Sequence, residues 1–261
     1  MGFTVSEEGD MRFRSLALLA SLGFVVAGLA ASTASANHAW SKYHWARTAN
    51  PFTIKLGDNV TAAWDDYLTL ASSDWSASTV MDTPVVPGST TGATCAATAG
   101  RVEVCNAAYG ATGWLGVAQI SISRGRHITQ GTAKVNDTYY TTGSKYDTAY
   151  WRAHVMCQEV GHDFGLGHQD ESGADLHTCM DYYNMAVPHE HTKHPNQHDY
   201  DQLVDIYSHL DPSTTISAGA AANPNAAPVA IERSDRISNT IIHEHFKDGS
   251  ERLTHIYWAL P

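Results

Sequence analysis

The sequence predicts an α+β domain, in which a few amphipathic helices pack against one sheet. Two patterns carry this prediction. From Val60 to Trp75, apolar side chains recur at intervals of three and four residues, which indicates a helix with one buried face. Between residues 101 and 140 the chain instead has short β-rich runs separated by stretches rich in Gly and Thr, which indicates strands of one sheet.

The N-terminal part of the domain should begin with a strand and a helix. Residues 52–56 alternate apolar and polar side chains like a half-buried strand, and Asp58 and Asn59 then offer an N-cap for the helix that reaches Trp75. The aromatic side chains on the apolar face of this helix are expected to belong to the core. Three strands of the sheet should follow, at residues 101–105, 117–123 and 132–140.

Two more helices are predicted in the second half of the domain. One runs from residue 147 or 148 to Phe164, where Gly165 favours a helix end because glycine readily adopts a left-handed conformation. The other follows Asn196, whose side chain can cap a helix N-terminus. The first of these helices carries the residues that point to a function.

Composition changes after the last predicted helix. Residues 212–228 are rich in Ala, Asn, Pro, Ser and Thr, which is typical of a linker. Residues 239–246 and 252–259 then flank a Lys-Asp-Gly-Ser turn, which predicts a β-hairpin. Because a lone hairpin is only marginally stable, residues 229–261 are expected to dock as a small appendage on a main domain of residues 37–211.

Residues 1–36 have the features of a secretory signal peptide. A short basic start at residues 11–14 precedes an almost wholly apolar stretch, and Ala34-Ser35-Ala36 supplies small residues for cleavage. The apolar stretch has about 15 residues, against roughly 20 needed to span a bilayer, so no stable membrane anchor is expected after cleavage. With Met11 as an alternative start, the mature protein is predicted to be secreted and extracellular.

Charge and cysteine content limit the classes of partner. The net charge is −11 and no run of Lys and Arg occurs, so binding to a phosphate backbone lacks its electrostatic basis and nucleic acid is not expected. Four cysteines in an exported chain favour two disulfides, for which three pairings are possible. Cys95 with Cys105 would close a short loop, and Cys157 with Cys179 would form the second bond. A zinc site built from thiolates would lack any Cys-x-x-Cys pair.

Residues 158–168 point to metal chemistry. On a helix, Gln158 and His162 are one turn apart and project from the same face, which is the spacing of two ligands of one metal ion. In a His-Glu-x-x-His arrangement the glutamate, here Glu159, is the general base for the water that the metal activates. A chain reversal at Gly165 would bring His168 back to the same ion.

With Cys179, Met180 and Tyr182 downstream, this segment resembles the metzincin peptidases and is most similar to the matrixins among them. The resemblance covers roughly residues 40–211 and is specific only within residues 158–182. It implies a zincin-type domain with a twisted mixed sheet, an active-site helix, a methionine turn at Met180 and a C-terminal helix. It also implies a zinc ion bound by His162, His168 and Gln158, where Gln158 replaces the first histidine of the family motif.

The resemblance implies a secreted zinc metalloendopeptidase that acts on proteins or peptides. Glu159 would serve as the general base, and Tyr182 would hydrogen-bond the oxyanion as the Met-turn tyrosine does in some metzincins. Because an amide oxygen is a poorer zinc ligand than imidazole, Gln158 is expected to lower the metal affinity. Two other functions stay open: an extracellular binding protein with impaired catalysis, and a metal-binding protein without peptidase activity.

Other side chains are candidates for a reserve ligand or a second metal. Four histidines follow the Met-turn and could fold over the cleft, although a solvated polar loop is the alternative: His189, His191, His194 and His198. Calcium is common in the resembled families, and three carboxylates could contribute without forming a calcium-loop spacing: Asp137, Asp170 and Asp175. The wall of the substrate pocket is expected at residues 183–188.

Overall fold

The computed structural model describes residues 38–181, 189–216, 227–235 and 239–260. The predicted signal peptide, Tyr182, the pocket wall at residues 183–188 and most of the predicted linker lie outside these ranges. Within the described residues, no helix combines the length and apolar character that crossing a bilayer requires.

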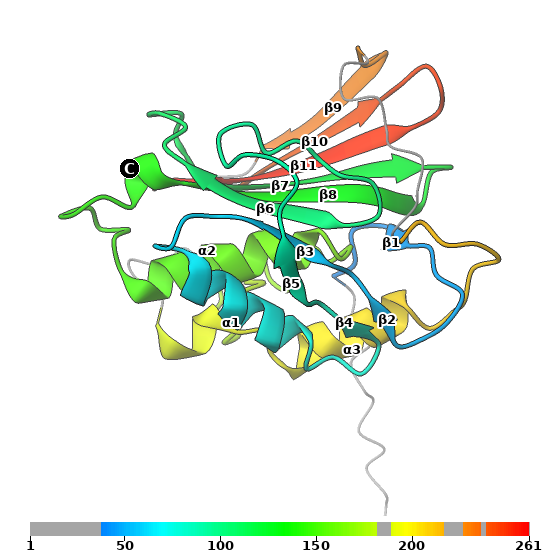
Figure 1. Ribbon diagram of the computed structural model, residues 1–261, viewed down its shortest axis with the longest axis horizontal. Coiled ribbons are helices and arrows are strands. Elements are labelled where there is room, and N and C mark those ends of the chain that lie inside the picture. Colours follow the sequence, from blue (N-terminus) through cyan, green and yellow to red (C-terminus); the bar gives the residue numbers. More distant parts are fainter. Residues whose placement is uncertain (1–37, 182–188, 217–226, 236–238, 261) are drawn as a thin grey trace, which may run out of the picture. The chain divides into compact units, whose positions relative to one another are not determined.

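The fold is mixed α+β, with the helices on one side of a long sheet (Figure 1). The helical elements are α1 (Asp65–Trp75), α2 (Ala149–His162) and α3 (Gln197–Ile206), with short 3-10 turns η1 (Asp137–Tyr139) and η2 (Glu190–Lys193). The strands are β1 (His44–Trp45), β2 (Phe52–Thr53), β3 (Leu56–Asn59), β4 (Met81–Asp82), β5 (Val85–Pro87), β6 (Val102–Ala107), β7 (Trp114–Ser123), β8 (His127–Asn136), β9 (Ala230–Asp235), β10 (Asn239–His245) and β11 (Glu251–Trp258).

The described strands of the main sheet follow the order β5-β3-β6-β8-β7-β11-β10-β9, and β1 pairs with the start of β8. The strands β5, β3, β6 and β8 are parallel to one another, whereas β7 and the three C-terminal strands join as antiparallel neighbours. A separate parallel pair is formed by β2 and β4. The sheet is therefore mixed, as the metzincin resemblance implied.

The predicted C-terminal hairpin is confirmed, and it continues the main sheet. Strands β10 and β11 pair with each other, and β11 pairs along β7 from Glu251 opposite Ile122 to Trp258 opposite Trp114. A strand edge offers unpaired N–H and C=O groups, and β11 satisfies those of β7 while gaining stability that an isolated hairpin lacks. Strand β9 was not predicted, because residues 231–234 are exposed and show no buried face.

The helix ends follow the local capping chemistry. Thr148 caps α2 by accepting a hydrogen bond from the Trp151 amide, and Asn196 caps α3 by accepting one from the Asp199 amide, so both predicted starts are confirmed. The predicted start of α1 was too early. Asn59 is still in β3, which continues to this residue because it pairs with β6 there, and the helix begins only at Asp65.

The core fills the space between the sheet and the helices. The largest fully buried side chains include Trp45, Trp64, Trp75 and Trp151. Almost every residue in the second half of α2 is buried, because the helix packs on β7, β8 and β11 on one side and on α1 on the other. Polar groups at the end of α2 are therefore held away from water.

Both predicted disulfides are present. Cys95 is bonded to Cys105, and Cys157 in α2 is bonded to Cys179. The second bond joins α2 to the segment around Met180, so it restricts how far this helix and this segment can separate.

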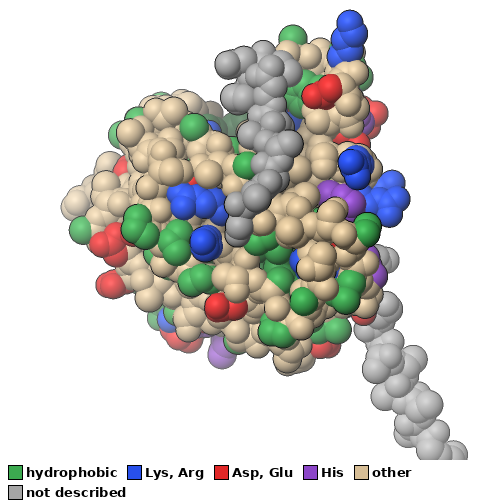
Figure 2. Space-filling model, turned by 45° about the vertical axis from the view of Figure 1, so that its right-hand side comes forward, with side chains coloured by type: hydrophobic (Ala, Val, Ile, Leu, Met, Phe, Trp, Pro, Cys, Tyr) green, Lys and Arg blue, Asp and Glu red, His purple; other side chains and the backbone are tan. Residues whose placement is uncertain are grey.

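Charged side chains are distributed over the surface. On the face drawn in Figure 2, Lys and Arg side chains lie in separate groups, with acidic side chains also present.

Candidate metal centre

The chain reverses directly after α2, as the sequence predicted. Gly165 has a φ of 89°, and a Cβ atom at this position would lie 2.3 Å from the carbonyl oxygen of Tyr43, so glycine is required by both conformation and space. The reversal returns His168 to the end of the helix, where its ring centroid is 4.9 Å from that of His162. The two predicted imidazole ligands therefore lie together.

A third imidazole completes this group. His255 on β11 has its ring centroid 4.1 Å from that of His162 and 4.9 Å from that of His168. One potential ligand atom from each of the three residues lies within 4.8 Å of the other two. The third histidine thus comes from the C-terminal strand, and we call His162, His168 and His255 the three-histidine cluster.

Hydrogen bonds orient two of these rings for metal binding. Nδ1 of His162 lies 2.8 Å from the carbonyl oxygen of Leu166, and Nδ1 of His255 lies 3.1 Å from Oε2 of Glu159. An imidazole that donates through Nδ1 keeps a lone pair on Nε2, and metal-binding histidines commonly use this arrangement. The Nε2 atoms of His162 and His255 are both buried and have no hydrogen-bond partner among the described residues.

Burial keeps the three rings neutral. Desolvation lowers the pKa of His162 well below its usual value, lowers the pKa of His168 to about 4 and lowers the pKa of His255 to about 3. A metal ion binds the neutral form of imidazole, so no proton has to be displaced from these rings at neutral pH. The donor set, three neutral nitrogens, is one that zinc prefers.

Glu159 lies next to the cluster and is fully buried. Burial raises the pKa of its carboxyl group well above the usual range. The side chain reaches the sheet at Gly116 of β7, where a Cβ atom would lie 2.7 Å from Oε1 of Glu159 and 2.6 Å from a methyl carbon of Val155. Glycine at this position lets α2 approach the sheet closely enough for Glu159 to contact His255.

Gln158 contacts the segment around Met180. Its amide nitrogen donates hydrogen bonds to the carbonyl oxygens of Cys179 at 2.7 Å and Asp181 at 3.0 Å. Its Oε1 atom is buried and has no hydrogen-bond partner within the described ranges. Met180 packs against the same helix, since a Cβ atom at Gly161 would lie 2.7 Å from its sulfur. Gln158 as a metal ligand stays a prediction, and Oε1 is the atom that would have to bind the metal.

The four histidines at residues 189–198 lie in other surroundings. His189 contacts the carboxylate of Asp175 at 2.7 Å, His194 contacts that of Asp74 at 2.7 Å, and His198 stacks on His38. His191 is exposed on η2. The sequence pointed to this loop for a reserve ligand, whereas the third imidazole of the cluster comes from β11.

The three aspartates considered for calcium each serve a local structure. Asp137 accepts hydrogen bonds from Trp64 and Asn106, and the carboxylate of Asp170 accepts hydrogen bonds from the turn that follows it. Asp175 is engaged by His189. These local bonds account for the positions of the three carboxylates.

His255 was missed because the relation that positions it is not local. Alternation along β11 places Leu253, His255 and Tyr257 on one face, which the sequence could reveal. That this face meets α2 depends on the pairing of His255 with Ala118 in β7, more than a hundred residues away.

Comparison of the chain with protein-family models, with curated proteins and with solved structures found no match.

Proposed function

We propose that this chain is a secreted zinc metalloendopeptidase in which His162, His168 and His255 hold the metal. The observation that carries the proposal is the convergence of three buried, neutral imidazoles within 4.8 Å of one another. Three protein ligands with a fourth position left for water or substrate form the usual donor set of a catalytic zinc ion. The resemblance of residues 159–168 and of Met180 to the metzincins supports the same class of enzyme.

The order of elements also supports this assignment. A strand and a helix (β3 and α1) are followed by the sheet strands β6 to β8, the long helix α2, the segment around Met180 and the closing helix α3. This is the order that the metzincin resemblance implies. The strands β9, β10 and β11 follow α3 and are not part of that order, and β11 supplies His255.

The proposed reaction is hydrolysis of a peptide bond. A zinc ion bound here would supply a Lewis acid for the scissile carbonyl and lower the pKa of water towards neutrality. In this conformation burial favours the protonated form of Glu159. Once exposed to water and ionised beside the metal, Glu159 takes the proton from the attacking water and returns it to the leaving amine. The Gln158 amide and the Cys157–Cys179 disulfide hold the Met-turn against α2, which keeps the ligands in place.

A peptide has no direct route to the cluster while β11 is in place. His162, Glu159 and His255 are all fully buried, and Oε2 of Glu159 is engaged by Nδ1 of His255. If β11 moves away from β7, Glu159 is released, the β7 edge becomes free to pair with an extended peptide, and His255 leaves the metal. We therefore infer that the three-histidine cluster holds zinc in a latent conformation. Once β11 has moved, His162 and His168 would keep the ion with Oε1 of Gln158 as the third donor, so β11 controls access.

A disulfide between β7 and β11 would test this control. Gln119 and Thr254 are opposed in register, and their side chains are hydrogen-bonded at 2.9 Å. Opposed residues of antiparallel strands have Cα atoms about 4.5–5.5 Å apart, which suits a disulfide. The oxidised Gln119→Cys/Thr254→Cys protein is expected to bind zinc but not to cleave casein, and mild reduction should restore cleavage.

The two single-cysteine variants are the controls for this experiment, because they carry the same substitutions without the bond. The native disulfides have buried sulfurs and are expected to resist mild reduction. An oxidised double variant that cleaves casein as fast as the controls would show that β11 does not have to move.

A metal-binding protein without peptidase activity is the second candidate. It is favoured by the Glu159–His255 hydrogen bond, since a carboxylate that orients a ligating histidine is typical of metal sites in general. Zinc analysis combined with casein digestion separates the two functions. Bound zinc with chelator-sensitive cleavage supports the peptidase, and bound zinc without cleavage supports the metal binder. The absence of both zinc and cleavage supports a scaffold.

A further inference from the structure

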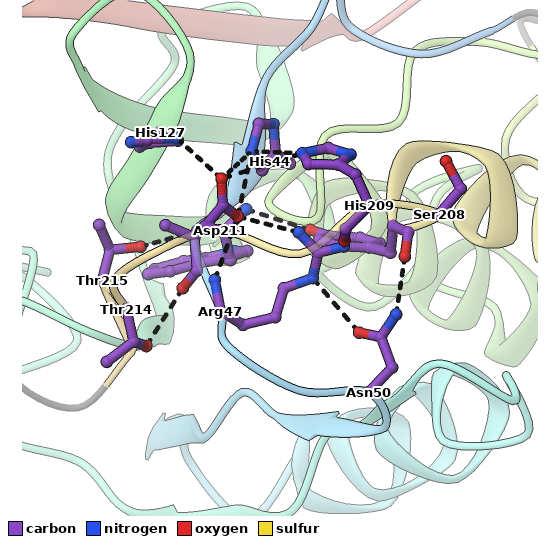
Figure 3. A network of polar contacts seen from close by, with 12 residues as sticks. His44, Arg47, Asn50, His127, Ser208, His209, Asp211, Thr214 and Thr215 are labelled. Carbon is purple, nitrogen blue, oxygen red and sulfur yellow. Dashed lines mark hydrogen bonds and ion pairs between the residues drawn. The ribbon is translucent and has the colours of Figure 1, made fainter.

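Three other histidines converge on a carboxylate where distant segments meet (Figure 3). His44 is in β1, His127 begins β8, and His209 and Asp211 follow α3. Strand β1 pairs with β8 at His44–His127 and Trp45–Ile128, and the residues after β1 are hydrogen-bonded to the segment after α3, for example through Arg47 and Asp211.

The distances among His44, His209 and Asp211 suit three ligands of one metal ion. Oδ1 of Asp211 lies 3.5 Å from Nε2 of His44 and 3.9 Å from Nε2 of His209, and the three residues offer ligand atoms that all lie within 4.8 Å of one another. His127 pairs with the same carboxylate oxygen at 3.2 Å but is not part of that group. The Nε2 atoms of His44 and His209 are 3.1 Å apart. Ligands at 2.0–2.1 Å around tetrahedral zinc lie about 3.3 Å from one another, close to most of these separations.

The orientation of His44 favours a cation at the centre. Its Nδ1 atom is 2.8 Å from the carbonyl oxygen of Lys42, so this nitrogen carries the proton in the neutral ring and Nε2 has a lone pair. That lone pair faces a carboxylate oxygen of Asp211 and a nitrogen of His209. Without a metal, Nε2–H of His209 can donate to this lone pair. A metal ion at the centre would instead be bound by both Nε2 atoms and by Oδ1, and the Nδ1 hydrogen bond would support the His44 ring.

Arg47 leaves this side of the carboxylate available. Its Nη1 atom and its backbone amide both donate to Oδ2 of Asp211, at 3.0 Å and 3.3 Å, and its Nη2 atom donates to the carbonyl oxygen of His209. Oδ1 is the oxygen on which the imidazoles converge. Beside the group, a cavity of about 330 Å³ is lined in part by His44, His209, Lys42 and Arg126, which provides a route of entry.

We propose that His44, His209 and Asp211 form a second zinc site with a structural role. The bound ion would tie β1 to the segment that follows α3. This junction supports the three-histidine cluster, because the Trp45 indole donates to the carbonyl oxygen of Asp163 and the Tyr207 hydroxyl donates to that of Phe164. Both acceptors lie in the turn between His162 and His168.

Zinc stoichiometry tests this proposal by elemental analysis of the full chain. The wild-type protein is expected to hold two zinc ions and the His209→Gln protein one. Removing zinc with a chelator should lower the melting temperature of the wild type more than that of His209→Gln. His191→Gln, which alters an exposed histidine outside both groups, is the matched control and should hold two ions.

The same measurement separates this site from the proposed function. If only the second site exists, the wild type holds one ion, His209→Gln loses it and His255→Ala keeps it. If His209→Gln keeps the full wild-type zinc content and its effect on melting, the proposal is wrong and the group is an Asp211 ion-pair network. The His209 side chain is half exposed, so its substitution should not prevent folding.

Discussion

The His255→Ala protein is expected to lose the zinc ion of the three-histidine cluster, with its dissociation constant raised at least about 100-fold. Removing a hydrogen-bonding neighbour of a ligand already costs about 10–100-fold in affinity, and removing the ligand itself costs more. The substitution also leaves the buried carboxylate of Glu159 without its contact to Nδ1. Titration against a fluorescent zinc chelator measures the change.

The matched control is His191→Ala, because this exposed histidine of η2 lies outside the cluster. It should bind zinc like the wild type. Circular dichroism must also confirm that the His255→Ala protein remains folded. Wild-type zinc affinity in a folded His255→Ala protein would mean that β11 contributes no ligand. Gln158 would then be the candidate for the third ligand of the zinc ion.

The Glu159→Gln protein is expected to keep its zinc and to lose about 100–10,000-fold in peptidase rate, the contribution typical of a general base. Glutamine has nearly the same shape and can still accept a hydrogen bond from Nδ1 of His255 through its oxygen, but it cannot take a proton. The rate of casein cleavage and the zinc content are measured on the same sample. Glu190→Gln, at an exposed glutamate, is the control and should behave like the wild type.

Two results would contradict the role of Glu159. Cleavage at the wild-type rate would show that Glu159 is not the base. A drop of about 10–100-fold in zinc affinity with no loss of rate at saturating zinc would instead assign Glu159 to orienting His255. The two roles are therefore distinguished by which quantity changes.

Local signals predicted the parts of the fold that local chemistry determines. Thr148 and Asn196 marked the starts of α2 and α3, because capping depends only on the next three residues. Gly165 marked the reversal, since its positive φ and the nearby Tyr43 carbonyl exclude a side chain. These signals were enough to bring His162 and His168 together and to identify Glu159 as their neighbour.

Long-range pairing decided what the sequence could not predict. The pattern of β11 predicted a strand, but only its register with β7 brings His255 to α2. Gly116 gave a hint, because glycine inside a strand often marks a close approach of another element, yet it does not identify that element. The group around Asp211 was missed for the same reason: His44 and His209 are 165 residues apart in the chain.

The start of α1 shows how sheet pairing can override a local capping signal. Asn59 is a good cap residue, but its side chain donates to Glu103 and its backbone continues β3 beside β6. The helix therefore begins only after residue 64, which provides no side-chain cap. A helix that packs its buried face against α2 tolerates this loss.

The most direct test of the central claim is a crystal structure with anomalous diffraction recorded on both sides of the zinc absorption edge. The account predicts a zinc peak about 2.0–2.1 Å from a ring nitrogen of each of His162, His168 and His255. A zinc ion bound by His162 and His168 with the His255 ring turned away, or no anomalous peak between these rings in zinc-saturated protein, would contradict it.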